Sequence, residues 1–427
     1  DNDDGDVQIT IEEDATPTLN ISYSNIANDS LGVTQGGGTL NWGDGNIDVD
    51  PRFVSVIEGE EDHHLLASSL CINAAHPDST DSDGTQLDMG AYPYLVDHDG
   101  SDWYVETSGS DVSGAGTSGN PFASIQAALN ATKGNPELYE TQTINVEAGI
   151  YYENIEWPVL VTSDIKLLGA GIDSSIIDGG GIDRVINMDG YTDVIPNNVL
   201  VGRDTEISGF TIQNGNGSSS GGGGIYIEWE NPTLSNLDIR DNQTVNEGGG
   251  IFLSWAGPLI DNVIIRDNEA LHGGGITAGS CINNATLDNV IITGNTATGE
   301  GGGLNFSYGE LTINNTEISK NESGDSGGGI SAYSNGGYLQ LDGITIADNI
   351  AGNGGGGIDI EADNDSFITT ITNSIIVNNT GGSQLNLGDN VVIDISYSNI
   401  SDGLNVGVIW EYTGGFFYEN NIDVDPH

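Results

Sequence analysis

The feature that most constrains this chain is a run of three glycines placed directly before a short apolar segment. The run occurs six times, and Ile or Leu follows it each time. Successive runs lie 26, 25, 28, 26 and 28 residues apart. Self-similarity with a period of about 20–50 residues is typical of solenoids, in which each repeat contacts only its neighbours. The runs end at Gly224, Gly250, Gly275, Gly303, Gly329 and Gly357.

A second phrase keeps the same period, as in NLDIRDN and NVIIRDN, and it closes on Asn. Two short β-prone runs per period with Gly and Asn turns between them indicate strands, because no useful helical period is present. Glycine permits a sharp turn and a close approach of successive backbones. We expect each Asn to take the left-handed conformation and to bond the Asn of the next coil. This predicted turn ladder comprises the six glycines above and Asn242, Asn268, Asn295, Asn321, Asn349 and Asn379.

Alternation along the segment after each glycine run predicts its buried side. Ile251 and Leu253 should point inward, while Phe252 and Ser254 should point outward. The same alternation recurs after each run, so stacked coils would align apolar residues in a column. A single coil cannot bury this side alone, and several coils must therefore stack.

A longer echo links the two ends of the sequence. ISYSNI at 21–26 returns at 395–400, and NIDVDP at 46–51 returns at 421–426. We interpret the chain as one period of a tandem array of modules of about 375 residues. Alternatively, the N-terminal piece of one molecule completes the C-terminal end of another by strand addition. A third interpretation is an internal duplication without a role in assembly.

The formal charge of the 427 residues is −56, with only 8 Lys and Arg. Nucleic acid and anionic membranes are therefore excluded as partners, because both require a basic surface. The acidity suits an extracellular protein, a high-salt environment or general association with divalent cations such as calcium. We find no signal peptide and no run long enough for membrane insertion. Because the chain starts at Asp1 without Met, we expect a processed or excised segment. Cys71 and Cys281 should be buried free thiols.

The repeated phrases resemble those of right-handed parallel β-helix proteins of the pectin-lyase-like superfamily, in its secreted and cell-surface, tandem-module versions. WYVETSGSDVSGAGTSGNPFASIQAALNATKG resembles the N-terminal cap of such helices, and HLLASSLCINAAHPDSTDSDGTQLDMGAYPY resembles a module-terminating segment. The resemblance implies an all-β solenoid with coils of about 26 residues and a short capping α-helix near 121–133. We expect this helix to be amphipathic, with Ile125, Ala128 and Leu129 on its apolar face.

The resemblance also divides the chain. Residues 1–95 would hold the closing coils and terminating segment of one module, and 96–102 would form a linker. Residues 103–160 would hold the cap and first coil, and 161–427 the remaining coils. The superfamily includes lyases, hydrolases, adhesins and filaments, so the resemblance indicates the fold and leaves the activity open.

For catalysis, the strongest candidate is a pair of Arg-Asp dipeptides in adjacent coils. Arg240 with Asp241 and Arg266 with Asp267 would lie one coil apart and could hold a uronate. The alternative, which we favour, is a ladder of surface ion pairs. The catalytic phrases expected of pectin hydrolases and pectate lyases are absent. His272 occupies a position held by Glu247, Glu300 or Ser326 in other coils, and we expect it to face solvent.

The best candidate for a metal site is the segment DSTDSDGTQLD. Its carboxylates surround Gly84, but the spacing departs from an EF-hand loop because both end ligands are missing. The alternatives are a different kind of calcium site and a solvated turn. The candidate ligands are Asp78, Asp81, Asp83 and Asp88.

Aromatic residues and glycosylation sequons give two further groups. Stacked aromatic rings can bind sugar faces, but parity directs Trp229, Trp255 and Tyr308 inward or into the turn, which favours core stacking, and it leaves Tyr226 and Phe252 as a small exposed patch. Sequons license N-glycosylation only where the producing cell has the machinery. They lie at Asn20, Asn28, Asn130, Asn216, Asn242, Asn284, Asn305, Asn314, Asn321, Asn364, Asn378 and Asn399.

The sequence therefore predicts a non-catalytic, extracellular or cell-surface protein of structural or adhesive type. It would be a rigid β-helix rod that repeats or assembles end to end, as in a filament, with calcium as a candidate stabiliser. The alternative is a polysaccharide lyase or hydrolase that acts on acidic glycan through Arg240 and Arg266, or a glycan-binding module without turnover.

Overall fold

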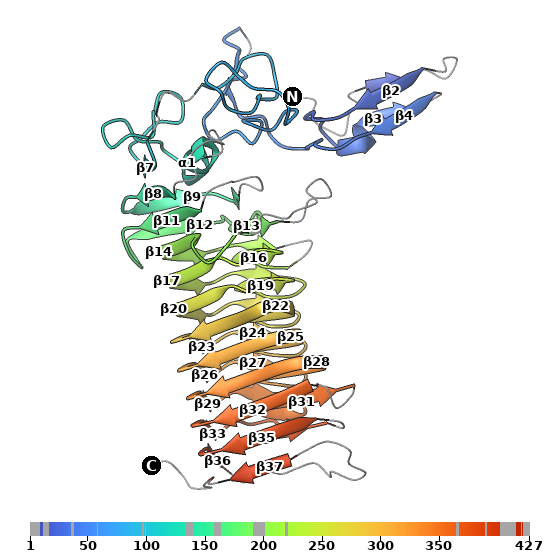
Figure 1. The fold of residues 1–427 in the computed structure, drawn as a ribbon, viewed down its shortest axis with the longest axis vertical. Coiled ribbons are helices and arrows are strands. Elements are labelled where there is room, and N and C mark those ends of the chain that lie inside the picture. Colours follow the sequence, from blue (N-terminus) through green and yellow to red (C-terminus); the bar gives the residue numbers. More distant parts are fainter. Residues whose placement is uncertain are drawn as a thin grey trace. The chain divides into compact units, whose positions relative to one another are not determined.

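The computed structural model describes residues 9–11, 17–35, 38–57, 59–95, 98, 100–132, 141–157, 164–190, 201–217, 221–363, 367–388, 391–401, 416–419 and 421. The chain forms two compact units (Figure 1). The first comprises Asp1–Asn145 with the short segments 160–163 and 193–197. The second comprises Val146–Val159, Asp164–Thr192 and Asn198–His427. No helix among the described residues is long and apolar enough to cross a membrane.

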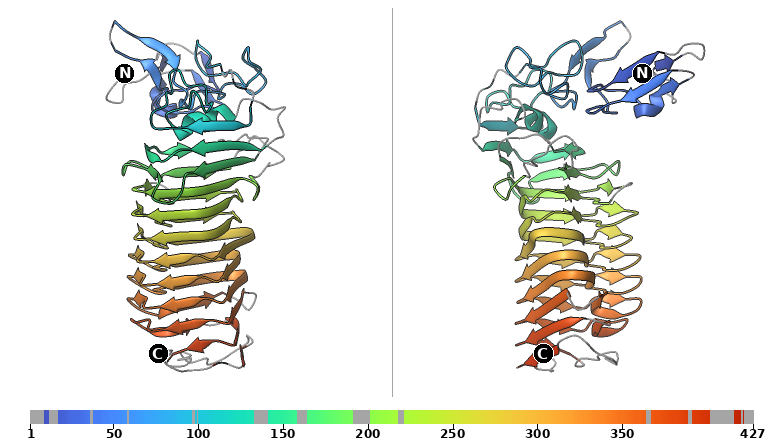
Figure 2. Two further views of the ribbon diagram at one scale, coloured as in Figure 1. Left: turned by 90° about the vertical axis from the view of Figure 1, so that its left-hand side faces the viewer. Right: turned by 45° about the vertical axis from the view of Figure 1, so that its right-hand side comes forward.

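The second unit is a parallel β-helix, as the repeats predict. Both views in Figure 2 show strands of successive coils lying side by side. Each coil that carries a glycine run has a two-residue strand before the run, a strand at or directly after it (face A), and a segment that bends into faces B and C. Face A contains β10 (Ile155–Glu156), β13 (Ile186–Asp189), β16 (Ile225–Glu228), β19 (Ile251–Ser254), β31 (Gly355–Ala362), β34 (Ser383–Leu387) and the first parts of β22 (Ile276–Asp288), β25 (Leu304–Asn314) and β28 (Ile330–Asp342).

The remaining strands of this unit follow the same scheme. Face B contains β11 (Ile165–Gly169), the first parts of β14 (Glu206–Gln213), β17 (Thr233–Arg240) and β20 (Leu259–Arg266), the last parts of β22, β25 and β28, and then β32 (Phe367–Thr372), β35 (Val392–Ser396) and β37 (Phe416–Glu419). Face C contains β9 (Gly149–Tyr152), β12 (Ser175–Asp178), the last parts of β14, β17 and β20, and β23 (Ile291–Thr293), β26 (Glu317–Ser319), β29 (Thr345–Ala347), β33 (Ile375–Val377) and β36 (Asn399–Ile400). The two-residue strands are β15 (Asn216–Gly217), β18 (Gln243–Thr244), β21 (Glu269–Ala270), β24 (Thr296–Ala297), β27 (Glu322–Ser323) and β30 (Ile350–Ala351).

The predicted apolar column runs through face A. The residue after each glycine run pairs in register with its counterpart in the next coil, and every member is fully buried. Burial of such side chains stabilises the fold by about 1.5–3 kcal/mol each. The glycine period therefore sets the register of the whole unit. The column consists of Ile225, Ile251, Ile276, Leu304, Ile330 and Ile358.

The glycines of each run have two distinct roles. Gly248 has a φ of +69°, which favours glycine at the turn. A Cβ on Gly249 would lie 2.4 Å from the carbonyl oxygen of Gly274, and one on Gly250 would lie 2.7 Å from that of Gly275. The second and third glycines are therefore required by the close approach of neighbouring coils.

The asparagines stack in a buried ladder along the next corner. Asn268 Nδ2 donates to Asn295 Oδ1 at 2.9 Å and to the carbonyl of Ile239 at 3.0 Å. The left-handed conformation does not fall on the asparagine, as we expected, but on the residue before it, such as Asp267 with a φ of +56°. This turn residue points its side chain outward and lets the asparagine point inward.

The first unit contains the predicted cap helix and short strands. Its elements are β1 (Ile9–Ile11), β2 (Thr18–Ile21), a 3₁₀-helix (Asp29–Gly32), β3 (Val33–Gln35), β4 (Thr39–Trp42), β5 (Phe53–Ser55), β6 (Asp62–Leu65), β7 (Asp102–Val105), α1 (Ile125–Thr132) and β8 (Gln142–Val146). β1 pairs with β3 and β2 with β4 in parallel, while β5 and β6 are antiparallel. Cys71 in this unit and Cys281 in the other are buried free thiols, as expected.

Helix α1 is the predicted cap helix, and all eight of its residues are buried, its polar side included. The polar side is covered by the module-terminating segment. Asn130 Nδ2 donates to the carbonyls of Ala67 at 3.0 Å and Ser69 at 2.9 Å, and the amide of Ala67 donates to Asp111 at 3.0 Å. The terminating segment and the cap, which the sequence placed on either side of a linker, thus lie in the same compact unit.

The two copies of the ISYSNI and NIDVDP phrases, near the two ends of the chain, also share a pattern of hydrogen bonds. Asn46 Nδ2 donates to the carbonyl of Ile21 at 3.1 Å, and Asn421 Nδ2 donates to that of Ile395 at 2.8 Å. Strand β2 pairs with β4 in parallel, just as β35 pairs with β37. Of the second NIDVDP phrase only Asn421 is described; residues 422–426 lie outside the described residues.

Two backbone details repeat as well. The amide of Ser24 donates to Asn46 Oδ1 at 3.1 Å, and that of Ser398 donates to Asn421 Oδ1 at 2.8 Å. The residue between strand and turn is left-handed in both copies, with a φ of +47° at Tyr23 and +54° at Tyr397. The first unit thus contains a coil with the geometry of the last described coil of the β-helix.

Candidate functional site

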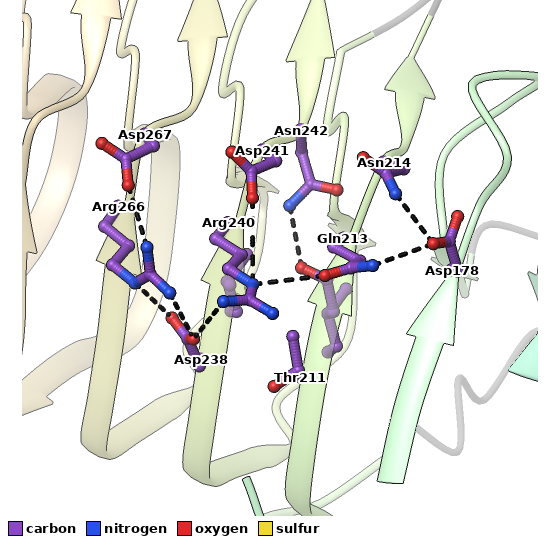
Figure 3. Close-up of polar contacts among 12 residues, drawn as sticks. Asp178, Thr211, Gln213, Asn214, Asp238, Arg240, Asp241, Asn242, Arg266 and Asp267 are labelled. Atoms are coloured by element: carbon purple, nitrogen blue, oxygen red, sulfur yellow. Dashed lines mark hydrogen bonds and ion pairs between the residues drawn. The ribbon is translucent and has the colours of Figure 1, made fainter. Parts of the chain in front are cut away.

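The two predicted arginines lie side by side on face C. Arg240 ends β17, Arg266 ends β20, and the two residues are paired in register. Asp241 and Asp267 follow them in the left-handed turn position, with φ values of +54° and +56°. The structure therefore brings together all four residues, as Figure 3 shows.

A third carboxylate, which the sequence analysis did not single out, joins the two arginines. Asp238 lies two residues before Arg240, and its side chain is only 5% exposed. Arg266 binds it through two hydrogen bonds of 3.0 Å, and an Arg240 nitrogen lies 3.8 Å away. Arg266 also donates to Asp267 at 2.9 Å. The bidentate geometry is the strong form of an arginine–carboxylate pair.

The network continues over two coils beyond Arg240 (Figure 3). Arg240 Nε donates to Gln213 Oε1 at 3.2 Å, and Gln213 Nε2 donates to Asp178 Oδ2 at 2.8 Å. Asn214 donates to the same carboxylate oxygen at 2.7 Å. Burial opposes the ionisation of Asp178, but the hydrogen bonds from Gln213, Gly180 and Asn214 outweigh it and lower its pKa. The whole row is thus a chain of matched donors and acceptors.

The electrostatics of this arginine–aspartate ladder disfavour proton abstraction. Partial burial of Arg266 opposes its charge, but the hydrogen bonds and charges of Asp238 and Asp267 outweigh it and raise its pKa. A general base needs a pKa near the working pH, so this shift is in the wrong direction. Both arginines have charge partners on their own coils, which leaves little net positive charge to hold a uronate.

In the predicted calcium loop, the carboxylates accept hydrogen bonds from the protein itself. Asp81 accepts from the amide of Asp88 at 3.0 Å, and Asp83 accepts from Thr85 at 2.8 Å. Asp88 accepts from the amides of Asn73 and Tyr94, while Asp78 is exposed. Burial raises the pKa of Asp88 to about 6, helped by the neighbouring charges of Asp81 and Asp83 and opposed by those two amides. No group of three or more metal-binding side chains is found in the part of the chain that the structure describes.

Face A carries a groove that the sequence analysis missed. Its volume is about 440 Å³. One side consists of residues that precede the glycine runs in successive coils, and the floor consists of outward residues of β25, β28 and β31. The lining residues are Glu247, His272, Glu300, Asn305, Ser307, Ser326, Ser331, Ala332, Tyr333, Asp359 and Glu361.

The groove is acidic and holds titratable groups with shifted pKa values. Burial and the charges of Asp359, Glu300 and Asp325 raise the pKa of Glu361. A hydrogen bond to Asp363, with partial burial, raises the pKa of Tyr333 to about 12. His272 is half-buried, and its Nδ1 accepts from the amide of Glu300 at 3.1 Å. The groove favours cations and hydroxyl-rich ligands and disfavours polyanions.

Trp229 and Trp255 lie at the turn after the face A strand, one of the two expected placements. Trp229 and Trp255 stack with ring centroids 5.0 Å apart, but Trp255 is 44% exposed. The cause is the left-handed backbone at Trp255, with a φ of +51°, which ends the alternation of the strand. Tyr226, which we expected in an exposed patch, is buried under the Arg184 guanidinium 4.3 Å from its ring centre.

Tyr308 lies at the corresponding bend. Its φ is +63° and it is 38% exposed, so it takes the turn placement and not the core placement of the two that were expected. Phe252 is half-buried against Tyr226, with ring centroids 5.3 Å apart, so the expected exposed patch does not form there.

Residues 107–336, more than half of the chain, match a family model described as "Protein of unknown function (DUF1565)". The chain belongs to this family. The match and the fold together confirm the resemblance to parallel β-helix proteins. No curated protein matches the chain. Among solved structures, a mannuronan C-5 epimerase AlgE6 A-module of Azotobacter vinelandii matches at 13% identity and a TM-score of 0.37, covering 71% of this chain and 95% of its own.

The predicted glycosylation sites of this family member divide by burial. Asn130, Asn242, Asn321 and Asn399 are buried, so the folded protein has no room for a glycan there. Asn20, Asn28 and Asn378 are exposed, and Asn364 lies outside the described residues. Partly exposed positions are Asn216, Asn284, Asn305 and Asn314.

Proposed function

We propose that the protein is a non-catalytic, extracellular or cell-surface structural protein, in which β-helix modules join end to end. One observation carries the proposal: the coil at residues 18–46 repeats the strand pairing and hydrogen bonds of the coil at 392–421. A protein built as a continued solenoid needs the same coil at each junction. A module that acts alone has no such requirement.

The arginine–aspartate ladder supports a structural role. Arg240 and Arg266 are neutralised by Asp241 and Asp267 on their own coils and by Asp238, which lies on the coil of Arg240 and also pairs with Arg266 on the next coil. The raised pKa of Arg266 is what an ion-pair ladder produces and the reverse of what a catalytic base requires. The net charge of −56 further opposes the approach of an acidic glycan.

Electron microscopy of the purified protein, with and without a calcium chelator, tests the proposal. We expect filaments with an axial repeat of one module, because the proposal needs end-to-end joints. Fraying after chelation would add calcium to the joints. Isolated short particles in both conditions would contradict end-to-end assembly.

A second candidate is a glycan-binding protein without turnover, and the groove on face A favours it. Tyr333 and the carboxylates of Glu300, Asp359 and Glu361 offer the hydrogen-bonding groups that recognise sugar hydroxyls. The acidity of the groove points to neutral or amino sugars. Incubation with a panel of such polysaccharides, followed by sedimentation, distinguishes the two candidates. Assays for new ultraviolet absorbance with polyuronates test lyase activity in the same samples.

A further inference from the structure

The floor of the groove on face A consists of two rows of side chains that cross three successive coils. Neighbouring strands lie about 4.8 Å apart, so each row repeats its polar groups at that step along the axis of the β-helix. A regular series of positions suits a ligand that is itself a chain of similar units. The rows, paired in register and with one residue per coil, are Asn305–Ser331–Asp359 and Ser307–Tyr333–Glu361.

The first row presents polar groups that have no partner in the protein. Ser331 is only 4% exposed, yet its hydroxyl makes no hydrogen bond within the part of the chain that the structure describes, and neither does the Asn305 amide one coil away. Asp359 is also 4% exposed, and only its Oδ1 is used, by the amide of Gly355 at 3.0 Å and by Asn386 at 2.7 Å. Buried polar groups are costly without a partner, so this row requires water or a ligand rich in hydroxyl and amino groups.

The charge of the groove favours a cationic ligand. Four of the described residues that line it are carboxylates, and only His272 among them can carry a positive charge. Burial and the neighbouring carboxylates raise the pKa of Glu361, which is the effect of negative charges gathered without a counter-ion. An ammonium group would relieve this repulsion, whereas the carboxylate of a uronate would add to it.

An aromatic ring lies at the end of the face A segment opposite to the glycine run. Tyr333 is 37% exposed, and its hydroxyl donates to Asp363 at 2.7 Å, which holds the ring in place. Tyr308, 38% exposed, packs edge-on against it with ring centroids 6.2 Å apart. Such half-exposed rings offer an apolar face beside polar groups, which is the surface that the apolar face of a sugar ring requires.

We infer that this groove binds a linear glycan whose sugars carry free amino groups, with one sugar per coil. The ammonium groups lie beside Asp359 and Glu361, sugar hydroxyls bond Ser331 and Asn305, and one ring packs on Tyr333. The inference rests on the glycan-binding candidate proposed above and specifies its ligand. A lysine-rich peptide would match the charge alone, because its side chains bring no hydroxyl groups to the unpartnered row.

Titration calorimetry with a glucosamine trisaccharide, in a mildly acidic buffer that keeps the sugar amines charged, tests the inference. Two ligands serve for comparison. The N-acetylated trisaccharide keeps the rings and loses the charge, while trilysine keeps the charge and lacks the rings. We expect the glucosamine trisaccharide to bind at least about tenfold more tightly than either, because it alone forms both the charged and the hydroxyl hydrogen bonds.

Two substitutions locate the site. Glu361→Gln should weaken binding of the glucosamine trisaccharide by about fivefold or more, since it removes a charge partner. Ser331→Ala should weaken binding of this ligand and leave binding of trilysine unchanged. Glu317→Gln is the matched control, because Glu317 is an exposed glutamate of β26 on face C and should have no effect.

Equal binding of trilysine and the glucosamine trisaccharide, or equal effects of Glu361→Gln and Glu317→Gln, would indicate attraction to the acidic surface in general and overturn the inference. Equal or tighter binding of the N-acetylated form would also overturn it, while the glycan-binding candidate stands. No binding of any of the three ligands would reject the inference together with that candidate. Filaments in the same preparation would then leave the proposed structural function intact.

Discussion

Buried carboxylates in this protein behave differently according to the groups around them. Asp238 is surrounded by two guanidinium groups and completes an ion-pair network. Glu230 is equally buried, but it accepts from the backbone amide of Val201 and lies near the negative charge of Asp189. Burial raises the pKa of Glu230, so this second carboxylate should stabilise the fold when it is protonated.

Replacement of Asp238 tests the ladder. Asp238→Asn should lower the free energy of unfolding by about 2 kcal/mol, because it leaves two partly buried guanidinium groups without their shared partner. The measurement is urea unfolding at neutral pH. Asp241→Asn is the matched control, since the Asp241 side chain is 55% exposed and should contribute less than about 0.5 kcal/mol. Equal effects of both substitutions would contradict the central role of Asp238.

Glu230 should give the stability a characteristic pH dependence. Burial raises its pKa to about 7 in the folded protein, aided by Asp189 and opposed by the Val201 amide. A carboxyl group with a raised pKa favours folding when protonated, so its contribution falls as the pH rises from about 4.5 to 7. Glu230→Gln should therefore be more stable than the wild type at pH 8, by about 2 kcal/mol, and no more stable near pH 4.5.

The comparison is made by urea unfolding of both proteins at pH 4.5, 6 and 8, after circular dichroism has verified that the variant is folded. Glu228→Gln, a half-buried neighbour on the same strand end, is the control. A difference between wild type and Glu230→Gln that does not change with pH would show that titration of Glu230 is not its cause.

At the level of the coil, the sequence predicts most of what the structure contains. The spacing of the glycine runs predicts the register between coils, and the repeated phrase that ends in Asn predicts the buried asparagine ladder. Both predictions succeed because they depend on contacts that recur from coil to coil. The αL turn residue was misplaced by one position, since Asp267 and Asn268 both tolerate that conformation. Trp255 lies at the turn and not in the core, because a left-handed residue at a strand end ends the alternation on which the inward placement depended.

The second glycine of a run should be intolerant of any side chain. Gly249→Ala should destabilise the β-helix by more than about 3 kcal/mol, because its Cβ would lie 2.4 Å from the Gly274 oxygen and 2.7 Å from the Glu269 oxygen. Thermal unfolding followed by circular dichroism measures this loss. Gly202→Ala is the control, as no atom lies within 4 Å of its new Cβ, and it should change little. A small effect at Gly249 would mean that the coils can separate locally.

At the scale of the whole molecule, the sequence revealed the echo between the chain ends but not its structural consequence. The identical sequences at 21–26 and 395–400 do not show which strands lie beside each copy in the folded protein. The groove on face A was missed for a related reason. Glu247, His272 and Glu300 come from successive coils, and only the three-dimensional register brings them to one side of the same hollow.

The net charge of −56 should make stability depend on salt in a way that separates screening from specific binding. Adding NaCl at neutral pH should raise the Tm, because it screens repulsion among the carboxylates. CaCl₂ and MgCl₂ should raise it further and to a similar extent, since both neutralise clustered acidic groups. General association of this kind needs no dedicated ligand set.

A dedicated calcium site would behave differently. CaCl₂ would exceed MgCl₂ at the same ionic strength, because the two cations differ in ligand number and geometry. The excess would disappear in a variant carrying Asp81→Asn and Asp83→Asn. We expect no such excess, because these carboxylates already accept hydrogen bonds from the Asp88 amide and from Thr85. Thermal unfolding of wild type and variant in matched chloride series therefore decides whether the acidic residues associate with cations in general or bind calcium at one dedicated site.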